Sequence, residues 1–431
     1  MSFTARRRQI FAVTWITYAG FYFCRKNLSI VLPLLLGVSG LRSIDLANII
    51  FGYSLFYAVG QFGFGFLSDR IGPKRIVGFG LLLVVGSNLL MGMRASLIWL
   101  LLFACLNGAG QSTGWSGLVK TMASWFSSRN RVVVMAWWGT NYVLGGFLAT
   151  AFATWSVAQH WILPRLGWRL GFFLPALVVL VITAIFFFGM EESPEKAGFV
   201  RRTWDDRPVV QSDRSSWRDL GILLCKPSLW TISISYFFLE LCRYALMFWL
   251  PFYMVNRLRY DLQTAGYLSS LYELVGILGA VIAGYVSDRL TQSRRAPVSV
   301  IMLCGLGVVM LLHPFLAKYG LAGTALAISL AGVLSYGPDT LLSGAAAQDI
   351  GEAKAAASAS GLVDGIGHLG ALFSPYVVVY VSGRYGWDRL FLIFAGAAFL
   401  AGAVLIPMWN LRPSLRPGAQ FEREVMPQIV S

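Results

Sequence analysis

The sequence predicts an all-α integral membrane protein with twelve transmembrane helices arranged in two pseudo-symmetric six-helix bundles. Three observations lead to this prediction. Of the 431 residues, 57% are hydrophobic and only 13% are charged, a composition outside the usual range of soluble domains. Apolar segments long enough to cross a bilayer recur along the chain. Two short motifs each occur twice, at matching places in the two halves.

The apolar segments are the second of these observations. Twelve of them reach the length needed to cross about 30 Å of hydrocarbon. They cover residues 9–36, 45–67, 76–93, 97–121, 132–156, 170–190, 228–255, 263–287, 297–317, 321–345, 355–381 and 390–409. We therefore expect an N-terminal bundle (1–190), a cytoplasmic linker (191–227), and a C-terminal bundle with a cytoplasmic tail (228–431).

The charge distribution predicts the orientation. Most of the 35 Lys and Arg residues fall on the side of the N-terminus and the linker, so the positive-inside rule places both termini in the cytoplasm. This topology also accounts for the formal charge of +15, with anionic lipid headgroups as its neighbours and no nucleic acid. We expect a monomer in a bacterial inner membrane.

Several function classes find no support in the sequence. The linker is too short and too polar for an enzyme domain. The chain has no Walker-type sequence and no nucleophile with a plausible base, and its five cysteines show no CxxC spacing. We expect no enzymatic activity, cofactor, metal or disulfide framework. A gradient or an exchange must therefore supply the energy for any transport.

The repeated motifs indicate a duplication with a central anion site. Cys24-Arg25 recurs as Cys242-Arg243, and Ser68-Asp69-Arg70 recurs as Ser287-Asp288-Arg289, 219 residues further on (288 − 69). An arginine at bilayer depth costs about 2.5 to 3.5 kcal/mol even on lenient scales. Two arginines at equivalent places therefore suggest an anion site on a pseudo-twofold axis.

The loop after the second segment resembles a known family signature. Residues 65–75, with Asp69 and Arg70, resemble the loop motif of the major facilitator superfamily, and residues 284–295, with Asp288 and Arg289, resemble a degraded copy. The resemblance implies the major facilitator fold. We expect these four residues to form a structural and gating latch, in which Asp69 meets the positive N-terminal end of a neighbouring helix.

A second set of residues carries a narrower resemblance: Tyr18, Tyr22, Arg25-Lys26-Asn27, Tyr57, Trp115, Arg243, Leu271-Tyr272-Glu273 and Tyr336-Gly337-Pro338. This set resembles the pattern of the organophosphate:phosphate antiporters, the group of the glycerol-3-phosphate and hexose-6-phosphate transporters. The resemblance implies that Arg25 and Arg243 hold the phosphate from two sides. Guanidinium suits this role because its planar fork donates two parallel hydrogen bonds to phosphate.

The sequence departs from that pattern at positions expected to read the rest of the substrate. Gln61 stands where the glycerol-3-phosphate transporter has a lysine, and Asn141 aligns with its histidine. His368 occupies the place of the family's tyrosine, with Asp364 one helical turn earlier. These changes make the site less basic than in that relative.

The acidic residues in the spans allow two interpretations each. Glu240 and Glu273 either neutralise an arginine until phosphate displaces them or form static pairs. Asp364 and His368 either line the pathway or satisfy each other. Lys26 points about 100° away from Arg25 on a helix, so its role as a direct ligand stays open. Asp339, after a proline, has no assigned role.

The sequence thus predicts a secondary active transporter that exchanges an organophosphate or phosphonate for inorganic phosphate by alternating access. Two alternatives remain. One is a proton-coupled symporter of another small organic anion, with Glu273 or Asp364 carrying the proton. The other is a transporter-like membrane sensor of a sugar phosphate.

Overall fold

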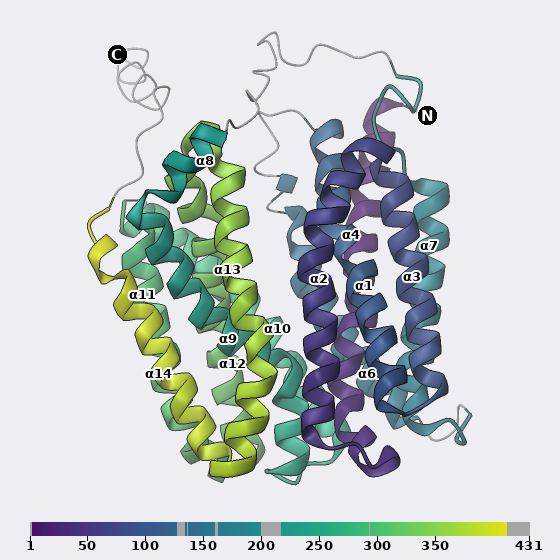
Figure 1. Cartoon of the computed structure of the whole chain (residues 1–431), viewed down its shortest axis with the longest axis vertical. Coiled ribbons are helices and arrows are strands. Elements are labelled where there is room, and N and C mark those ends of the chain that lie inside the picture. Colours follow the sequence, from purple (N-terminus) through teal and green to yellow (C-terminus); the bar gives the residue numbers. More distant parts are fainter. Residues whose placement is uncertain are drawn as a thin grey trace.

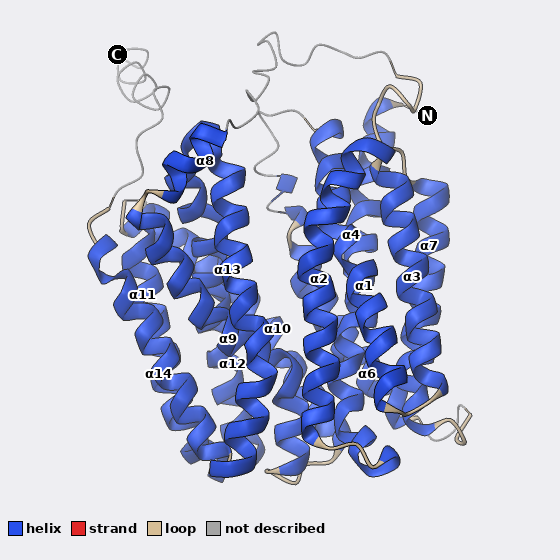
Figure 2. Cartoon of the chain, in the orientation of Figure 1, coloured by secondary structure: helices blue, strands red, loops and turns tan. Residues whose placement is uncertain are grey.

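The computed structural model describes residues 2–126, 134, 135, 137–159, 163–199, 217–292 and 294–411. Within these ranges every regular element is a helix, and no strand occurs (Figure 2). Residues 200–216 of the predicted linker and residues 412–431 lie outside the described residues.

The long helices of the described residues fall into two bundles of six, on opposite sides of the view in Figure 1. The first bundle contains α1 (Phe3–Ser39), α2 (Ser43–Ile71), α3 (Pro73–Met93), α4 (Leu97–Trp125), α6 (Thr140–Ala158) and α7 (Leu170–Gly189). The second contains α9 (Pro227–Asn256), α10 (Leu262–Tyr285), α11 (Arg295–Leu316), α12 (Gly320–Asp339), α13 (Ala347–Tyr385) and α14 (Trp387–Leu405).

Shorter elements connect or extend these helices. The eight-residue α8 (Trp217–Leu224) forms within the segment predicted to be a linker. Two π-helical segments, Val286–Leu290 and Thr340–Ala346, continue α10 and α12 directly. The remaining elements are single turns of 3₁₀ helix at Gly167–Arg169, Ala317–Tyr319 and Ile406–Met408.

The predicted spans agree with these helices. Each of the twelve apolar segments coincides with one long helix. The largest differences are at two helix starts: α13 begins at Ala347 rather than at residue 355, and α6 begins at Thr140 rather than at residue 132. Among the described residues, ten stretches are long and apolar enough to cross a membrane, and one of them, Arg295–Ala346, contains both α11 and α12. The prediction of an all-α membrane protein with two six-helix bundles is confirmed.

The two bundles meet at the end of the molecule remote from α8 and from the start of α1 (Figure 1). There α2 packs against α13, and α6 packs against α10. The Tyr376 hydroxyl donates a hydrogen bond of 3.0 Å to the side-chain oxygen of Asn48. At the α6–α10 contact, a Cβ on Gly266 would lie only 2.1 Å from the Thr154 hydroxyl oxygen. The described contacts between bundles thus close one end of the molecule.

Each bundle repeats the same close helix contact. In the first bundle a Cβ on Gly108 of α4 would lie 2.2 Å from the main-chain oxygen of Tyr53 in α2. In the second, a Cβ on Gly332 of α12 would lie 2.2 Å from the main-chain oxygen of Tyr272 in α10. Tyr53 and Tyr272 are separated by the same 219 residues (272 − 53) as the repeated loop motif. The duplication therefore extends to backbone packing.

A carboxylate from the predicted linker segment reaches the loop signature. The main-chain N–H of Lys74, in the first turn of α3, donates a 3.1 Å hydrogen bond to Glu192 Oε1. Gly72 precedes α3 with φ +104°, a conformation that favours glycine, and Glu192 packs against it. A carboxylate at a helix N-terminus is stabilised by the helix dipole. Glu192 fills the role expected of Asp69, whose side chain lies outside the described residues.

We predict that Gly332→Ala and Gly108→Ala each lower the melting temperature of the detergent-purified protein. The added methyl group would press on a main-chain oxygen that cannot move aside, and such overpacking typically costs about 1 to 3 kcal/mol. Gly86→Ala in α3 is the matched control, because no atom lies within 4 Å of its Cβ position. Equal melting temperatures for all three variants would contradict this account of the packing.

Candidate functional site

Arg25 is buried in α1 with only uncharged partners among its described contacts. Its Nε and Nη2 donate hydrogen bonds of 3.3 and 3.2 Å to Gln111 Oε1. The guanidinium carbon lies 4.6 Å from the ring centroid of Tyr22 and 4.8 Å from that of Tyr57. Gln111 is oriented by donating its Nε2 to the main-chain oxygen of Phe21 at 2.8 Å. Arg25 is 5% exposed, so its positive charge is buried without a described counter-ion.

Lys26, the next residue, points to the other bundle. Its ammonium forms an ion pair with Glu273 of α10, and both side chains are almost fully buried. It also donates a 3.5 Å hydrogen bond to the main-chain oxygen of Met247 in α9. Glu273 packs against Gly146 of α6, where a Cβ would lie 2.7 Å from Oε2. Lys26 therefore ties the two bundles together, and its charge is already balanced.

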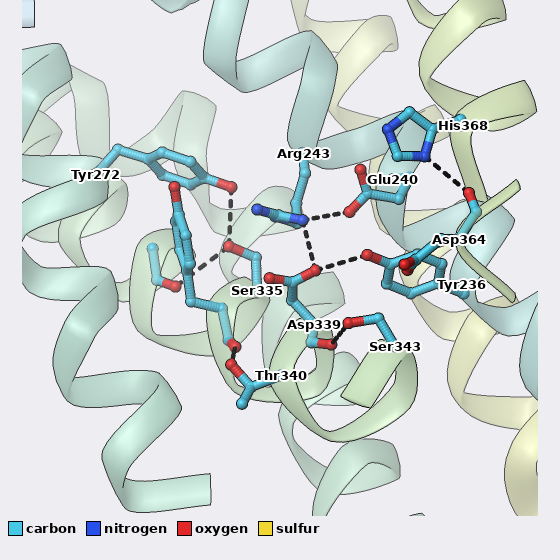
Figure 3. A network of polar contacts seen from close by, with 12 residues as sticks. Tyr236, Glu240, Arg243, Tyr272, Ser335, Asp339, Thr340, Ser343, Asp364 and His368 are labelled. Atoms are coloured by element: carbon cyan, nitrogen blue, oxygen red, sulfur yellow. Dashed lines mark hydrogen bonds and ion pairs between the residues drawn. The ribbon is translucent and has the colours of Figure 1, made fainter. Parts of the chain in front are cut away.

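Arg243 of α9 has the opposite environment to Arg25 (Figure 3). Its Nη1 forms ion pairs with Glu240, one turn earlier on the same helix, and with Asp339 at the end of α12, at 2.6 Å from Oδ1. Its guanidinium carbon lies 4.7 Å from the ring centroid of Tyr336. Two carboxylates thus hold one nitrogen of this arginine.

Further groups surround this ion pair (Figure 3). The Tyr236 hydroxyl donates a 2.8 Å hydrogen bond to Asp339 Oδ1. Asp364 and His368 of α13 lie on the same side of Arg243 as Tyr236 (Figure 3). His368 Nδ1 contacts the main-chain oxygen of Asp364 at 2.7 Å, so this contact does not involve the Asp364 carboxylate. That Asp364 and His368 line the pathway stays a prediction.

Aromatic rings link each arginine to the opposite bundle. Tyr57, beside Arg25, stacks on His368 of the second bundle with ring centroids 5.9 Å apart. Tyr336, beside Arg243, stacks on Tyr142 of the first bundle at 6.4 Å. The surroundings of both arginines therefore include groups from both halves of the chain.

The other predicted substrate residues are more dispersed. Tyr18 is buried in an aromatic cluster with Tyr22, Trp115 and Trp138. Gln61 is half-buried on α2, one turn beyond Tyr57. Asn141 is fully buried in α6, and neither of its side-chain polar atoms has a hydrogen-bond partner among the described residues.

Among the side chains that the structure describes, the predicted latch residues do not form one cluster. Asp288 forms an ion pair with Arg295, whose Nε also lies 3.4 Å from Asp349 of α13. Arg70 and Arg289 are exposed, and Arg70 lies over the ring of Phe66. In the second bundle, Arg295 rather than Arg289 therefore connects the loop to a neighbouring helix.

Sequence reasoning missed three residues of the site. Asp339 received no role because the preceding proline suggested a helix break, whereas α12 runs through Pro338 to Asp339. A carboxylate in an apolar span is itself a functional signal and would have pointed to it. Gln111 and Tyr236 carry no such signal, because their importance comes only from the arginine or acid beside them.

Two helical bundles with buried cations at their interface define a class of membrane transport proteins. The family model described as "Major Facilitator Superfamily" matches residues 14–375. The chain belongs to this superfamily, which comprises transporters rather than enzymes.

Similar proteins agree over nearly the full length. The chain is 28% identical to the glycerol-3-phosphate transporter of Bacillus subtilis, covering 94% of this chain and 92% of the relative. It is 30% identical to the membrane sensor protein UhpC of Salmonella typhimurium, with the same coverage. It is 26% identical to a probable hexose phosphate transport protein of Chlamydia trachomatis, covering 94% and 91%. The resemblance to organophosphate transporters is confirmed.

A solved structure supports the fold. The bacterial homologue of the human lysosomal transporter Spinster, inward-facing and unoccupied, superimposes with a TM-score of 0.74 at 14% identity. The match covers 94% of this chain and 95% of that one.

We predict that removing either partner of the Lys26–Glu273 pair destabilises the protein more than removing both. Lys26→Met or Glu273→Gln leaves one buried charge uncompensated, which typically costs about 3 to 5 kcal/mol, whereas the double variant leaves none. A double-mutant cycle on thermal unfolding in detergent measures the coupling. Strictly additive effects would show that the pair does not hold the bundles together.

Proposed function

We propose that this protein exchanges an organophosphate or phosphonate for inorganic phosphate across the membrane by alternating access. The buried Arg25 guanidinium, which lacks a described counter-ion and lies beside groups from both bundles, carries this proposal. A phosphoryl dianion would supply the missing charge and two parallel acceptors for the guanidinium fork. The names of the relatives, a glycerol-3-phosphate transporter and a probable hexose phosphate transport protein, favour the same substrate class.

Arg243 is the second proposed phosphate ligand. In the described state its Nη1 is occupied by Glu240 and Asp339, so a phosphate that binds to Nη1 has to displace at least one carboxylate. The resulting bridge from Arg25 to Arg243 would draw the two bundles together around the substrate. The Lys26–Glu273 tie and the α2–α13 contact then have to break for the opposite end to open.

The remaining proposed ligands follow from their places around the arginines. Tyr22, Tyr57 and Tyr336 offer ring faces beside the guanidinium groups. Asp364 and His368 would contact the non-phosphate part of the substrate, since His368 stacks on Tyr57. We further propose a plasma-membrane location with both termini cytoplasmic, from the distribution of Lys and Arg.

A sensor is the second candidate, because the relative at 30% identity is a membrane sensor protein. Radiolabelled phosphate counterflow in proteoliposomes separates the two. A transporter exchanges external label for internal phosphate, whereas a protein that only senses its ligand binds phosphate without exchange.

We predict that Arg25→Lys reduces phosphate counterflow by at least about 100-fold while the protein remains folded. Lysine keeps the charge but lacks the planar guanidinium group, which can donate hydrogen bonds to Gln111 and to a phosphate at the same time. Arg257→Lys is the control, because Arg257 is exposed and pairs with Asp388 away from the site. Near-normal counterflow by Arg25→Lys would contradict phosphate binding at this residue.

We also predict that phosphate counterflow continues when a protonophore removes any pH gradient. In an exchange the internal phosphate supplies the driving force, and equal charge moves in both directions. Counterflow measured with and without protonophore tests this directly. A complete loss of exchange on addition of the protonophore would favour a proton-driven symporter of another anion.

A further inference from the structure

One nitrogen atom of Arg243 is shared by two carboxylates from different helices. Glu240 Oε1 belongs to α9 and Asp339 Oδ1 to α12, and both contact Nη1 (Figure 3). Two oxygens in contact with the same nitrogen lie within a few ångström of each other. Both residues are buried, Glu240 at 2% exposure and Asp339 at 7%. Closely spaced buried carboxylates cannot both stay ionised easily, because like charges repel strongly where water is scarce.

The surrounding groups do not correct this surplus of negative charge. On α13, Asp364 adds a third carboxylate and His368 directs Nδ1 to a main-chain oxygen. On α10, Glu273 is already matched by Lys26 of α1. Arg25, also on α1, contacts Gln111 and tyrosine rings. Three tyrosines lie nearby: the Tyr236 hydroxyl donates to Asp339, the Tyr272 hydroxyl bonds to Ser335, and Tyr336 presents its ring face to Arg243.

Binding of phosphate makes the surplus larger. A phosphoryl oxygen that approaches Nη1 competes with Glu240 and Asp339 for the same donor. The displaced carboxylate loses its cation while it stays buried, and an uncompensated buried charge is costly. A proton on that carboxylate removes the charge without moving the side chain. Proton uptake is thus the least disruptive way to admit a dianion here.

We propose that the Glu240–Asp339 pair takes up one proton when phosphate binds to Arg243, so that organophosphate transport by this protein is coupled to proton movement. The inference rests on the proposed function and extends it. The proton comes from water on the side to which the site is open and bonds to a carboxylate oxygen. It returns to water on the other side when phosphate leaves and the carboxylate pairs with Arg243 again.

The sign of the resulting pH dependence follows from linkage. Because the phosphate-bound state holds more protons than the free state, phosphate affinity rises as the pH falls. With one linked proton, the dissociation constant increases about tenfold per pH unit. In exchange, one proton accompanies phosphate in each direction, so counterflow needs no pH gradient. Net uptake, in contrast, responds to one.

The test measures phosphate binding to the detergent-purified full chain by calorimetry between about pH 8 and 9, where inorganic phosphate is almost entirely a dianion. We expect about a tenfold increase in the wild-type dissociation constant over this unit. Glu240→Gln and Asp339→Asn each replace a carboxylate by a neutral isostere of its protonated form. For both variants we expect the dissociation constant to change at most twofold between pH 8 and 9. At pH 9 we expect both to bind phosphate more tightly than the wild type does. Asp261→Asn, at the N-cap of α10, serves as the control that keeps the wild-type slope.

Two results would overturn the inference alone. A wild-type dissociation constant that is independent of pH, or one whose slope survives in both variants, excludes proton uptake by this pair. If a pH-independent value is accompanied by at least tenfold tighter binding of 2-aminoethylphosphonate than of ethylphosphonate, a cationic group of the substrate offsets the carboxylates in place of a proton. Absence of any phosphate binding by the wild type would overturn the proposed function as well, which distinguishes the two failures.

Discussion

A positive charge held in the hydrocarbon region needs a partner, and the organisation of this protein follows from how Arg25, Lys26 and Arg243 obtain theirs. Arg25 is surrounded by an amide oxygen and two tyrosine rings, which solvate the guanidinium without cancelling its charge. Lys26 reaches across the bundle interface to Glu273. Arg243 is held by two carboxylates of its own bundle. Isolated charges at this depth would be expensive.

The three cation environments suit different steps of a transport cycle. The neutral surroundings of Arg25 leave its charge available to an anionic substrate. The Lys26–Glu273 pair stabilises the closed end. Separating the two charges costs free energy and so contributes to the barrier to opening that end, which substrate binding has to lower. The carboxylates at Arg243 occupy its Nη1, so this nitrogen becomes available to phosphate only when one of them withdraws.

The duplication explains why two arginines occupy equivalent helices, but it does not make the site symmetric. Backbone packing is repeated closely, since Gly108 meets Tyr53 in one half as Gly332 meets Tyr272 in the other. The side chains around the arginines have diverged. Arg25 donates hydrogen bonds to the neutral Gln111, whereas Arg243 donates to the carboxylates of Asp339 and Glu240. A symmetric scaffold therefore presents a cationic face on one side and an acidic face on the other.

The fold was predictable from the sequence because the hydrocarbon core requires every span to be long and apolar, and both properties can be read directly from the sequence. Arg25, Lys26, Glu240, Arg243 and Glu273 were predictable for the same reason, as charges in apolar segments. Their partners were not, since the choice between Glu240 and Glu273 for Arg243 depends on how α9, α10 and α12 pack. The direction of Lys26 toward the other bundle and the place of Asp339 also required three dimensions.

The most direct test of the central claim is an experimental structure determined with saturating inorganic phosphate. The account predicts tetrahedral density within hydrogen-bonding distance of both Arg25 and Arg243, with Glu240 or Asp339 withdrawn from Nη1. Phosphate density away from both arginines, with the two carboxylates still on Arg243, would contradict it.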